Sequence, residues 1–291
     1  MVHEMSDISA VISYYNREQY IDEAIQSVLA QTLQPLEIII VNDGSRESSR
    51  RYLDRYAAVC TIIDLPVNVG LAAARNEGIR RAKGGLIALL DDDDIWLPDK
   101  LAIQQRYLEE NPACDAVQSA AWAFFTHGPD ELWGFDRPSP LTLAAALTGE
   151  CTVIPASLVA RKELFQHLGS FDERFRLHEE RDFEIRLGAA GYRLQAIPEP
   201  LVRFRRQSHG NLSSRWINRL VWDAKLFWKH RALYRRAYGW RGTVNCIASG
   251  LYRAGKYVRI IGGVFRPVGG ALKSEWRTRP GYRDPVLAGT D

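Results

Sequence analysis

The sequence has few cysteines and no long apolar run, and both absences limit what it can be. Its 291 residues include four cysteines, which lie far apart and form no Cys-x-x-Cys pair. That spacing disfavours a zinc site or redox motif and suits a reducing compartment. No apolar stretch approaches the roughly 18 residues that a membrane-spanning helix needs. Residues 1–7 are polar and acidic, so no secretory leader is expected, and we predict a cytoplasmic location.

The sequence also lacks the glycine-rich loops of two classes of nucleotide-binding enzyme. Neither Gly-Lys-Ser nor Gly-Lys-Thr occurs, which excludes a P-loop. The polar segment after the first expected strand is Ser13-Tyr14-Tyr15-Asn16 and contains no glycine. Sugar nucleotidyltransferases hold a triphosphate in a glycine-rich loop at that place, so this class is disfavoured.

Charge is distributed unevenly along the chain. The net charge is +3, but residues 1–202 hold 31 Asp and Glu against 19 Lys and Arg, whereas residues 203–291 hold 4 against 19. An acidic body followed by a basic segment predicts two different partners. The apolar share of 46% is ordinary for a soluble globular protein of this length.

Strand and helix patterns alternate through the first half of the chain. Short apolar runs at 8–13, 37–41 and 60–64 are typical of buried strands, and the apolar positions within 21–29 follow a helical stripe that Asn16 could cap. This alternation predicts an α/β fold with a mostly parallel sheet. Farther along we expect a strand at 115–125, a helix at 181–190 and two strands at 192–197 and 201–204.

Four adjacent carboxylates, Asp91 to Asp94, follow a fourth expected strand, which is buried and begins near Gly85. Like charges this close raise one another's pKa, so a fold that keeps them together needs a positive partner there. The carboxyl ends of parallel strands are also where ligands bind in open α/β sheets. The alternative interpretation is a solvated acidic turn before the helix that Pro98 opens.

Two other polar clusters follow strands, namely Ser13 to Asn16 and Asn42-Asp43-Gly44-Ser45. In a parallel sheet all three clusters meet at one edge. Asp43 alone could also be a helix cap, and Arg75 and Asn76 could be polar residues on an exposed helix face.

The order of these motifs is more specific than any one of them. Asn-Asp-Gly-Ser is followed by Asn68-x-Gly-x-x-x-Ala-Arg75-Asn and then by Asp91-x-Asp-Asp-x-x-x-Pro98. The series resembles family 2 of the inverting glycosyltransferases over about residues 6–210. The resemblance implies a GT-A fold, a Rossmann-like, mostly parallel sheet flanked by helices. We expect a domain over 1–213, with a nucleotide-binding half at about 6–112, an acceptor-binding half at about 113–213, and a basic helical extension over 214–291.

The resemblance implies a nucleoside-diphosphate sugar as donor, with UDP-sugars commonest among relatives. It places Asp43 on the nucleobase and makes Ser13, Tyr15 and Asn16 candidates for the same pocket. Arg75 would lie near the nucleotide, where a guanidinium could contact a base carbonyl or a phosphate. Asp91 would face the ribose, and Asp92 would occupy the variable place beside it.

A divalent cation, Mn²⁺ or Mg²⁺, is implied between the carboxylates and the diphosphate. The family's Asp-x-Asp signature corresponds to Asp91 and Asp93, although four acids leave the register open by one residue. His209 lies in a segment that resembles a metal-proximal or diphosphate-proximal segment of some relatives, but its local spacing differs. The alternative for His209 is an ordinary surface loop.

Inverting transfer needs a general base near the acceptor oxygen. Relatives carry an acidic pair at a helix start, and the match here is His178-Glu179-Glu180-Arg181-Asp182. Glu180 stands where the family usually has aspartate, so we predict it as the base, with Asp182 and then Glu179 as alternatives. All three could instead be ordinary acids at a helix N-terminus.

Aromatic and basic residues alternate after residue 214, which predicts one or two amphipathic helices. One interpretation is peripheral contact of residues 214–265 with an anionic membrane, on the inner face of the cell membrane. The others are packing against the acidic domain and, last, nucleic-acid binding, for which no module is present.

The combined prediction is an inverting glycosyltransferase of the hexosyltransferase type. The resemblance implies a role in assembling cell-surface polysaccharide or glycolipid, with a saccharide or lipid-linked acceptor. The alternative is a catalytically inactive partner subunit that binds the nucleotide sugar. The glutamate at the place of the family's aspartate is the one feature that favours it.

Overall fold

The computed structural model describes residues 6–125, 130–133, 140–149, 153–206 and 221–239. The chain divides into two compact units, residues 1–208 and 209–291. In the first unit helices alternate with strands, and the strands form one sheet in the order β3-β2-β1-β4-β8-β6-β9-β5, with β7 paired to β6. The predicted α/β class is therefore confirmed.

Four parallel strands form the first part of the sheet: β1 (Ile8–Tyr14), β2 (Glu37–Asn42), β3 (Thr61–Asp64) and β4 (Leu86–Asp91). The apolar runs of β1, β2 and β4 are buried on both faces, as in sheets that helices cover on either side, whereas β3 at the end of the sheet is partly exposed. All four predicted strands are present at these places. The rest of the sheet contains both parallel and antiparallel pairs. The mostly parallel arrangement that we predicted therefore describes β1 to β4 best.

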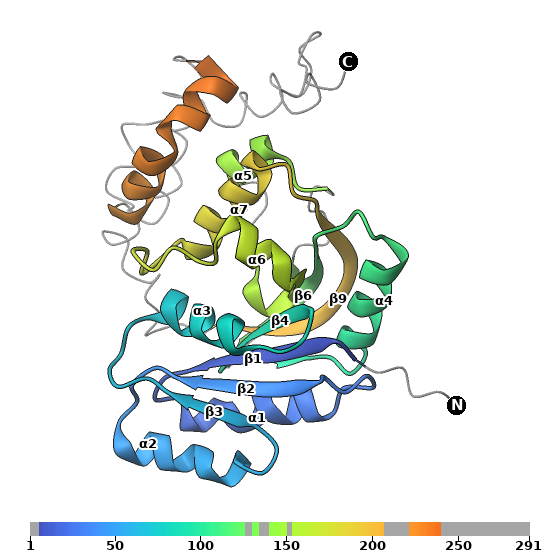
Figure 1. Cartoon of the computed structure of the whole chain (residues 1–291), viewed down its shortest axis with the longest axis vertical. Helices are drawn as coiled ribbons and strands as arrows, with labels where there is room; N and C mark the ends of the chain where they lie inside the picture. The colour runs from blue at the N-terminus through green and yellow to red at the C-terminus, as the bar shows by residue number, and fades with distance from the viewer. Residues whose placement is uncertain (1–5, 126–129, 134–139, 150–152, 207–220, 240–291) are drawn as a thin grey trace. The chain divides into compact units, whose positions relative to one another are not determined.

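Helices cover the two faces of these strands (Figure 1). Helices α1 (Glu18–Leu29) and α2 (Glu47–Tyr52, followed by a 3-10 turn at Leu53–Tyr56) lie below the strands in this view, and α3 (Leu71–Arg81) lies above β1 and β2. Successive strand residues point to opposite faces. Ile8, Ala10 and Ile12 therefore join the core that α1 builds, whereas Val11 faces α3.

The contact between α3 and the sheet requires a glycine. A Cβ atom at Gly78 would lie 2.2 Å from Cγ1 of Val11, so α3 approaches β1 more closely than any larger residue permits. The alanines in the first turn of α3 also allow the helix to lie close to the sheet. This close packing matters for function because α3 carries Arg75 and Asn76.

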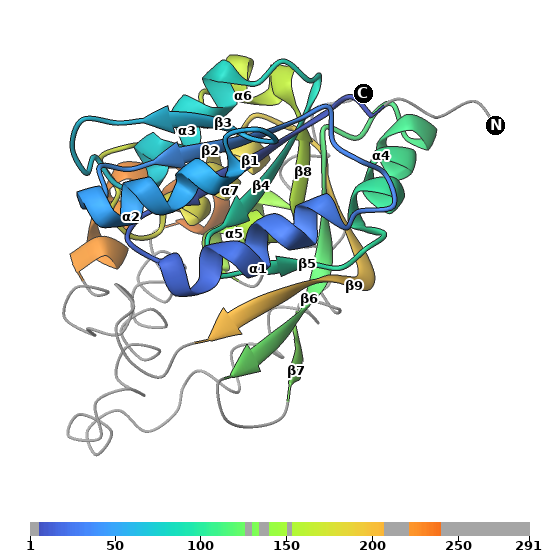
Figure 2. The same cartoon turned by 90° about the horizontal axis from the view of Figure 1, so that it is seen from below.

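The second half of the unit is built on two long paired strands. β6 (Ala116–Phe125) runs parallel to β9 (Leu194–Arg206), and β8 (Leu158–Arg161), β5 (Ile95–Trp96) and β7 (Glu131–Trp133) add antiparallel pairs. Figure 2 shows how far β6 and β9 extend beyond the first four strands. The described residues of this half also form the helices α4 (Lys100–Glu110), α5 (Leu143–Thr148), α6 (Lys162–Leu168) and α7 (Glu179–Ala189).

Two local predictions were wrong. We expected Asn16 to cap the first helix, but α1 begins at Glu18 with Arg17 at the N-cap, and Asn16 has a φ of 51°. We also expected two strands where β9 is continuous. Pro198 and Pro200 lie within β9, and the register against β6 shifts beside Ser119 and Ala120. An irregularity in the pairing thus accommodates the missing N–H groups, and the strand does not break.

In the second unit the described residues, 221–239, are helical. Trp228 is 67% exposed, Lys225 lies over the Trp222 ring at 4.0 Å, and Arg231 lies over the Trp228 ring at 4.6 Å. This agrees with the predicted alternation of aromatic and basic residues on a helix. Within the parts of the chain that the structure describes, no helix has both the length and the apolar character for a membrane crossing.

Candidate active site

The three polar clusters lie at one edge of the sheet, as the strand order requires. Ser13 at the end of β1 is level with Asp91 at the end of β4, and Tyr14 is level with Asn42 at the end of β2. Residues nearly 80 positions apart in sequence are therefore neighbours in the fold. The prediction that the three clusters share one edge of the sheet is therefore confirmed.

Asp43 holds the loop that leads into α3. It is 4% exposed, and its Oδ1 accepts a hydrogen bond from Val69 N at 2.7 Å. Its Oδ2 accepts from Gly70 N at 2.9 Å and from Asn68 Nδ2 at 2.9 Å. The Asn-Asp-Gly-Ser turn and the Asn68 motif are thus two parts of one structure. Gly44, at a φ of 63°, is required there because a Cβ would lie 2.3 Å from the Val67 carbonyl carbon.

Asp92 and Asp93 share one arginine that the sequence analysis did not single out. Arg17 Nη1 lies 3.1 Å from Asp92 Oδ1 and also pairs with Asp93. Tyr15 N donates to Asp92 Oδ2 at 2.9 Å. Burial, and then the carboxylates of Asp93 and Asp91, raise the pKa of Asp92 to about 7, although Arg17 opposes the shift. Desolvation likewise raises the pKa of Asp93.

Asp94 is the most deeply buried of the four carboxylates. Its Oδ1 accepts a hydrogen bond from Arg205 N at 2.9 Å, and its Oδ2 has no hydrogen-bond partner among the described residues. Burial and the neighbouring carboxylates raise its pKa well above the ordinary value. Arg205 also donates from Nε to the Asp93 carbonyl at 3.0 Å, so the end of β9 supplies the second positive group of this edge.

Arg75 joins the acidic edge to the start of α7. Its Nη2 donates to Asp91 Oδ1 at 2.7 Å and to Asp91 Oδ2 at 2.9 Å, and its Nη1 donates to Glu179 Oε1 at 3.0 Å. The Arg75 side chain is 3% exposed. The alternative of an arginine on an exposed helix face is therefore wrong for Arg75. Asn76 likewise exchanges hydrogen bonds with the backbone of Phe171.

The three candidate bases occupy different surroundings at the start of α7. Glu180 is partly buried, and desolvation followed by the Glu179 carboxylate raises its pKa to about 8. Asp182 is fully buried and accepts a hydrogen bond from Arg186 Nε at 2.8 Å. Glu179 is buried against Arg75. A carboxylate with a raised pKa is suited to accept a proton near neutral pH.

Backbone strain is concentrated in the same segments. Among the described residues other than glycine, Asn16 at a φ of 51° and His178 at 70° have positive values. Asn16 follows β1 and accepts a hydrogen bond from Arg46 N through Oδ1 at 2.9 Å, and His178 is the N-cap of α7. Such conformations persist where the surrounding contacts hold them, and functional sites are a common place for them.

The carboxylates are oxygen donors of the kind that Mg²⁺ and Mn²⁺ prefer. Asp91 and Asp93 keep part of their side chains exposed, and the Asp94 Oδ2 is a buried oxygen with no hydrogen-bond partner among the described residues. Across the described ranges no three acidic, histidine or cysteine side chains form a ligand group. A cation held by one or two carboxylates and by bound phosphate oxygens does not need such a group. The candidate ligand His209 lies outside the described residues.

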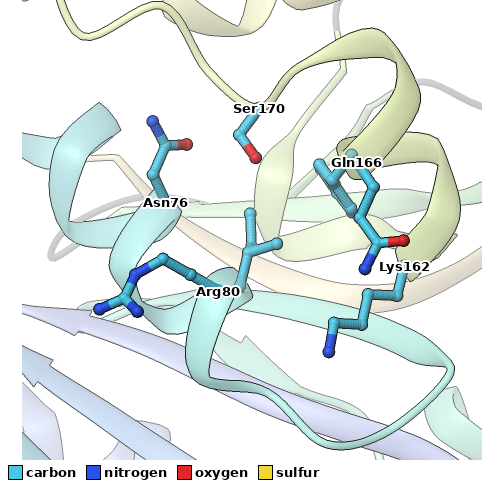
Figure 3. Close-up of a pocket in the computed structure, with 7 residues that line it drawn as sticks. Asn76, Arg80, Lys162, Gln166 and Ser170 are labelled. Carbon is cyan, nitrogen blue, oxygen red and sulfur yellow. The ribbon is translucent and has the colours of Figure 1, made fainter.

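A pocket of about 310 Å³ lies elsewhere, between α3 and α6 (Figure 3). Asn76, Arg80, Lys162, Gln166 and Ser170 line it. Lys162 N donates to the Gly85 carbonyl, just before β4 begins, so the pocket is near the amino end of that strand and not near Asp91. It contains none of the predicted site residues.

Comparison with known proteins yields matches over most of the chain. Residues 9–169 match the family described as Glycosyl transferase family 2. An uncharacterized glycosyltransferase of Methanocaldococcus jannaschii is 28% identical over 83% of this chain and 87% of its own length. An amylovoran biosynthesis glycosyltransferase of Erwinia amylovora is 26% identical over 81% of this chain and 90% of its own length.

The fold is also similar to a solved structure. The S. aureus TarS 1–349 complex with UDP-GlcNAc has a TM-score of 0.65 and 17% identity, covering 94% of this chain and 78% of that chain. At this identity the likeness shows the fold alone, and the predicted GT-A fold is confirmed.

Proposed function

The chain belongs to glycosyl transferase family 2, and from that premise we propose that it moves a sugar from a nucleoside-diphosphate sugar to an acceptor hydroxyl with inversion at the anomeric carbon. The observation that carries the proposal is the double contact of Arg75 with Asp91 and Glu179. It brings the strand edge where donors bind in such sheets next to the start of α7, where Glu180, the neighbour of Glu179, is the candidate base. Residues 6–112 would bind the nucleotide and residues 113–213 the acceptor.

A UDP-sugar is the proposed donor, supported by the TarS complex with UDP-GlcNAc. Ser13, Tyr15 and Asn16 would line the nucleoside pocket, together with the turn of Asp43. The Ser13 hydroxyl is buried without a hydrogen-bond partner among the described residues, and a ligand hydroxyl or carbonyl would satisfy it. The acceptor would be a saccharide or a lipid-linked saccharide, since a relative takes part in amylovoran biosynthesis.

Glu180 is the proposed general base. Its carboxylate would take the proton of the acceptor hydroxyl while that oxygen attacks the anomeric carbon and the nucleoside diphosphate leaves from the opposite face. The surroundings of the alternatives support this choice. Asp182 is fully buried and paired with Arg186, and Glu179 is buried and paired with Arg75.

Asp91 and Asp93 are the proposed ligands of a divalent cation, with Asp92 nearby on the nucleotide side. When bound, the cation would offset the negative charge that develops on the leaving diphosphate. Arg17 already pairs with Asp92 and Asp93, so it and the cation would compete for Asp93.

Residues 214–265 are proposed to contact an anionic membrane surface from the cytoplasmic side. The exposed Trp228 and the basic side chains of residues 221–239 support this, because indole rings and basic groups favour the membrane interface. The full-length Trp228→Glu variant should float less with anionic vesicles than wild type, whereas neutral vesicles should bind neither protein. Equal flotation of both proteins on anionic vesicles would contradict membrane contact through this helix.

The test of activity is release of UDP or transfer of sugar with a panel of UDP-sugars and Mn²⁺. Glu180→Gln should lower turnover by about 10²- to 10⁴-fold, as expected for loss of a general base, and leave UDP affinity within about twofold. Glu180→Asp restores the residue type usual in the family and should retain more activity than Glu180→Gln. Near-normal turnover of Glu180→Gln would place the base elsewhere.

The same panel distinguishes an enzyme from an inactive binding subunit. A subunit of that kind would gain thermal stability with a UDP-sugar, about 2.7 kcal/mol at 100 times its Kd, yet neither release UDP nor transfer sugar. Asp93→Ala is the control that should lose turnover in an active enzyme.

A further inference from the structure

Helix α3 holds the start of α7 through two consecutive residues. Asn76 Nδ2 donates to the Phe171 carbonyl at 2.8 Å and to Glu173 Oε1 at 2.9 Å, and Asn76 Oδ1 accepts from Phe171 N at 2.9 Å. Arg75, one residue earlier, donates to Glu179 at 3.0 Å. The segment from 171 to 179, which leads into α7, is thus tied at both ends to one turn of α3.

Aromatic packing continues this connection into α7. The Phe171 ring lies 5.1 Å from the Phe183 ring, which stacks on Phe165 of α6 at 5.4 Å. The Arg75 guanidinium carbon lies 5.5 Å from the centre of the Phe171 ring. Movement of α3 would therefore be transmitted to α7 by packed rings as well as by hydrogen bonds.

Arg75 has little capacity left for a bound nucleotide. The guanidinium is buried; Nη2 faces Asp91 and Nη1 faces Glu179, and Nε is also buried without a hydrogen-bond partner among the described residues. Its charge is near two carboxylates and also acts on the carboxylate of Glu180. A buried cation in this position acts through the residues that it holds.

We propose that Arg75 is a positioning residue that fixes Glu179 and Glu180 relative to the donor-side carboxylate Asp91, and that the Arg75–Glu179 pair sets the pH range in which Glu180 works. The inference rests on the proposed role of Glu180 as base. It assigns Arg75 to the assembly of the site across its two halves and not to direct contact with the donor.

The charged groups around Glu180 shift its pKa in opposite directions. Burial raises the pKa of Glu180, the carboxylates of Glu179 and Glu184 raise it further, and Arg75 lowers it. Glu184 accepts a hydrogen bond from Val153 N. Removing the Glu179 charge should therefore lower the pKa of Glu180, whereas removing the Arg75 charge should raise it.

The experiment compares the pH dependence of kcat/KM in Glu179→Gln, Arg75→Gln, Arg75→Lys and wild type. A base works when deprotonated, so its ionisation appears as a rise of kcat/KM with pH. The midpoint of that rise should move down by about one pH unit in Glu179→Gln and up by about one in Arg75→Gln. Arg75→Lys keeps the positive charge but loses the guanidinium group that reaches Asp91 and Glu179 at once. The midpoint of its pH profile should therefore stay near that of wild type while kcat falls.

UDP affinity, measured by calorimetry at one pH, separates positioning from donor binding. We expect it to stay within about threefold of wild type in all three variants. A more than tenfold loss of UDP affinity in Arg75→Lys with an unmoved midpoint would show that Arg75 contacts the donor, which overturns the inference. Where Arg75→Gln does not fold, Glu179→Gln decides, because a Gln at 179 can still accept from Arg75.

The two proposals can fail separately. Turnover that persists in Glu180→Gln removes the base assignment and the inference with it. An inactive Glu180→Gln together with an unchanged midpoint in Glu179→Gln leaves Glu180 as the base and overturns the inference about Arg75 and Glu179.

Discussion

Replacing Asp43 by Asn tests whether this carboxylate holds the loop before α3 in place or serves only to contact the nucleobase. The Asp43 carboxylate accepts three hydrogen bonds, from Val69 N at 2.7 Å, Gly70 N at 2.9 Å and Asn68 Nδ2 at 2.9 Å. Two of the three donors meet the same oxygen, Oδ2. An Asn side chain that keeps the bond from Val69 N must turn its amide group toward the other two donors.

The expected cost follows from that geometry. A hydrogen bond to a charged acceptor contributes about 1.5–3 kcal/mol, and two are lost in Asp43→Asn. The loop can move to relieve part of this, so we expect the free energy of unfolding to fall by about 3 kcal/mol. In a unit of this size, that corresponds to a melting temperature lower by roughly 6–12 °C.

The measurements are urea denaturation and UDP affinity of the same preparations. Asn68→Ala is the matched control, because it removes one of the three donors and leaves the carboxylate in place, and it should cost about 1.5 kcal/mol. Asp43→Asn should also bind UDP more weakly, since the loop lies at the predicted nucleoside pocket. Loss of UDP affinity with a free energy of unfolding within about 0.5 kcal/mol of wild type would refute the reasoning. Asp43 would then contact the nucleobase without stabilising the loop.

Three further predictions concern the pH dependence of turnover, cation binding and stability. Because the pKa of Glu180 is raised to about 8, kcat/KM of the wild-type enzyme should rise about tenfold between pH 6 and 7 and level off above pH 8; a flat profile over this range would contradict the assignment. Arg17→Gln removes the cation that pairs with Asp92 and Asp93, so calorimetry should show Mn²⁺ binding roughly tenfold tighter, a change of ~1.4 kcal/mol, and unchanged or weaker binding would refute competition. The Lys100 ammonium is fully buried over the Trp96 ring without a hydrogen-bond partner among the described residues, and burial lowers its pKa well below the ordinary value. The unfolded chain therefore takes up a proton that the folded protein does not, and stability falls as pH drops below about 10. Lys100→Met should be more stable than wild type at pH 7 in urea denaturation, with a difference that shrinks toward pH 10, and a gain that is equal at all pH values would contradict a depressed lysine pKa.

The predicted motifs are brought together as strand order requires, but their contacts are not those that each motif suggests alone. Asp43 has the environment of a loop anchor, Arg75 that of a buried bridge, and Asp182 that of a structural ion pair with Arg186. These residues can be identified in the sequence from their order and type. Arg17 and Arg205 cannot, because arginines are common after turns and at strand ends and neither belongs to a motif.

The sequence by itself determined the strand-and-helix alternation, the family and the identity of the acidic edge. These depend on local periodicity and on the spacing of residues along the chain, which can be read without coordinates. Only the tertiary structure decided which charge opposes which carboxylate. Arg17 is 75 residues from Asp92, Arg75 is 104 residues from Glu179, and Arg205 is 111 residues from Asp94. Such pairs, and the burial that shifts their pKa values, exist only once the strands and helices have packed, because both depend on distance in space.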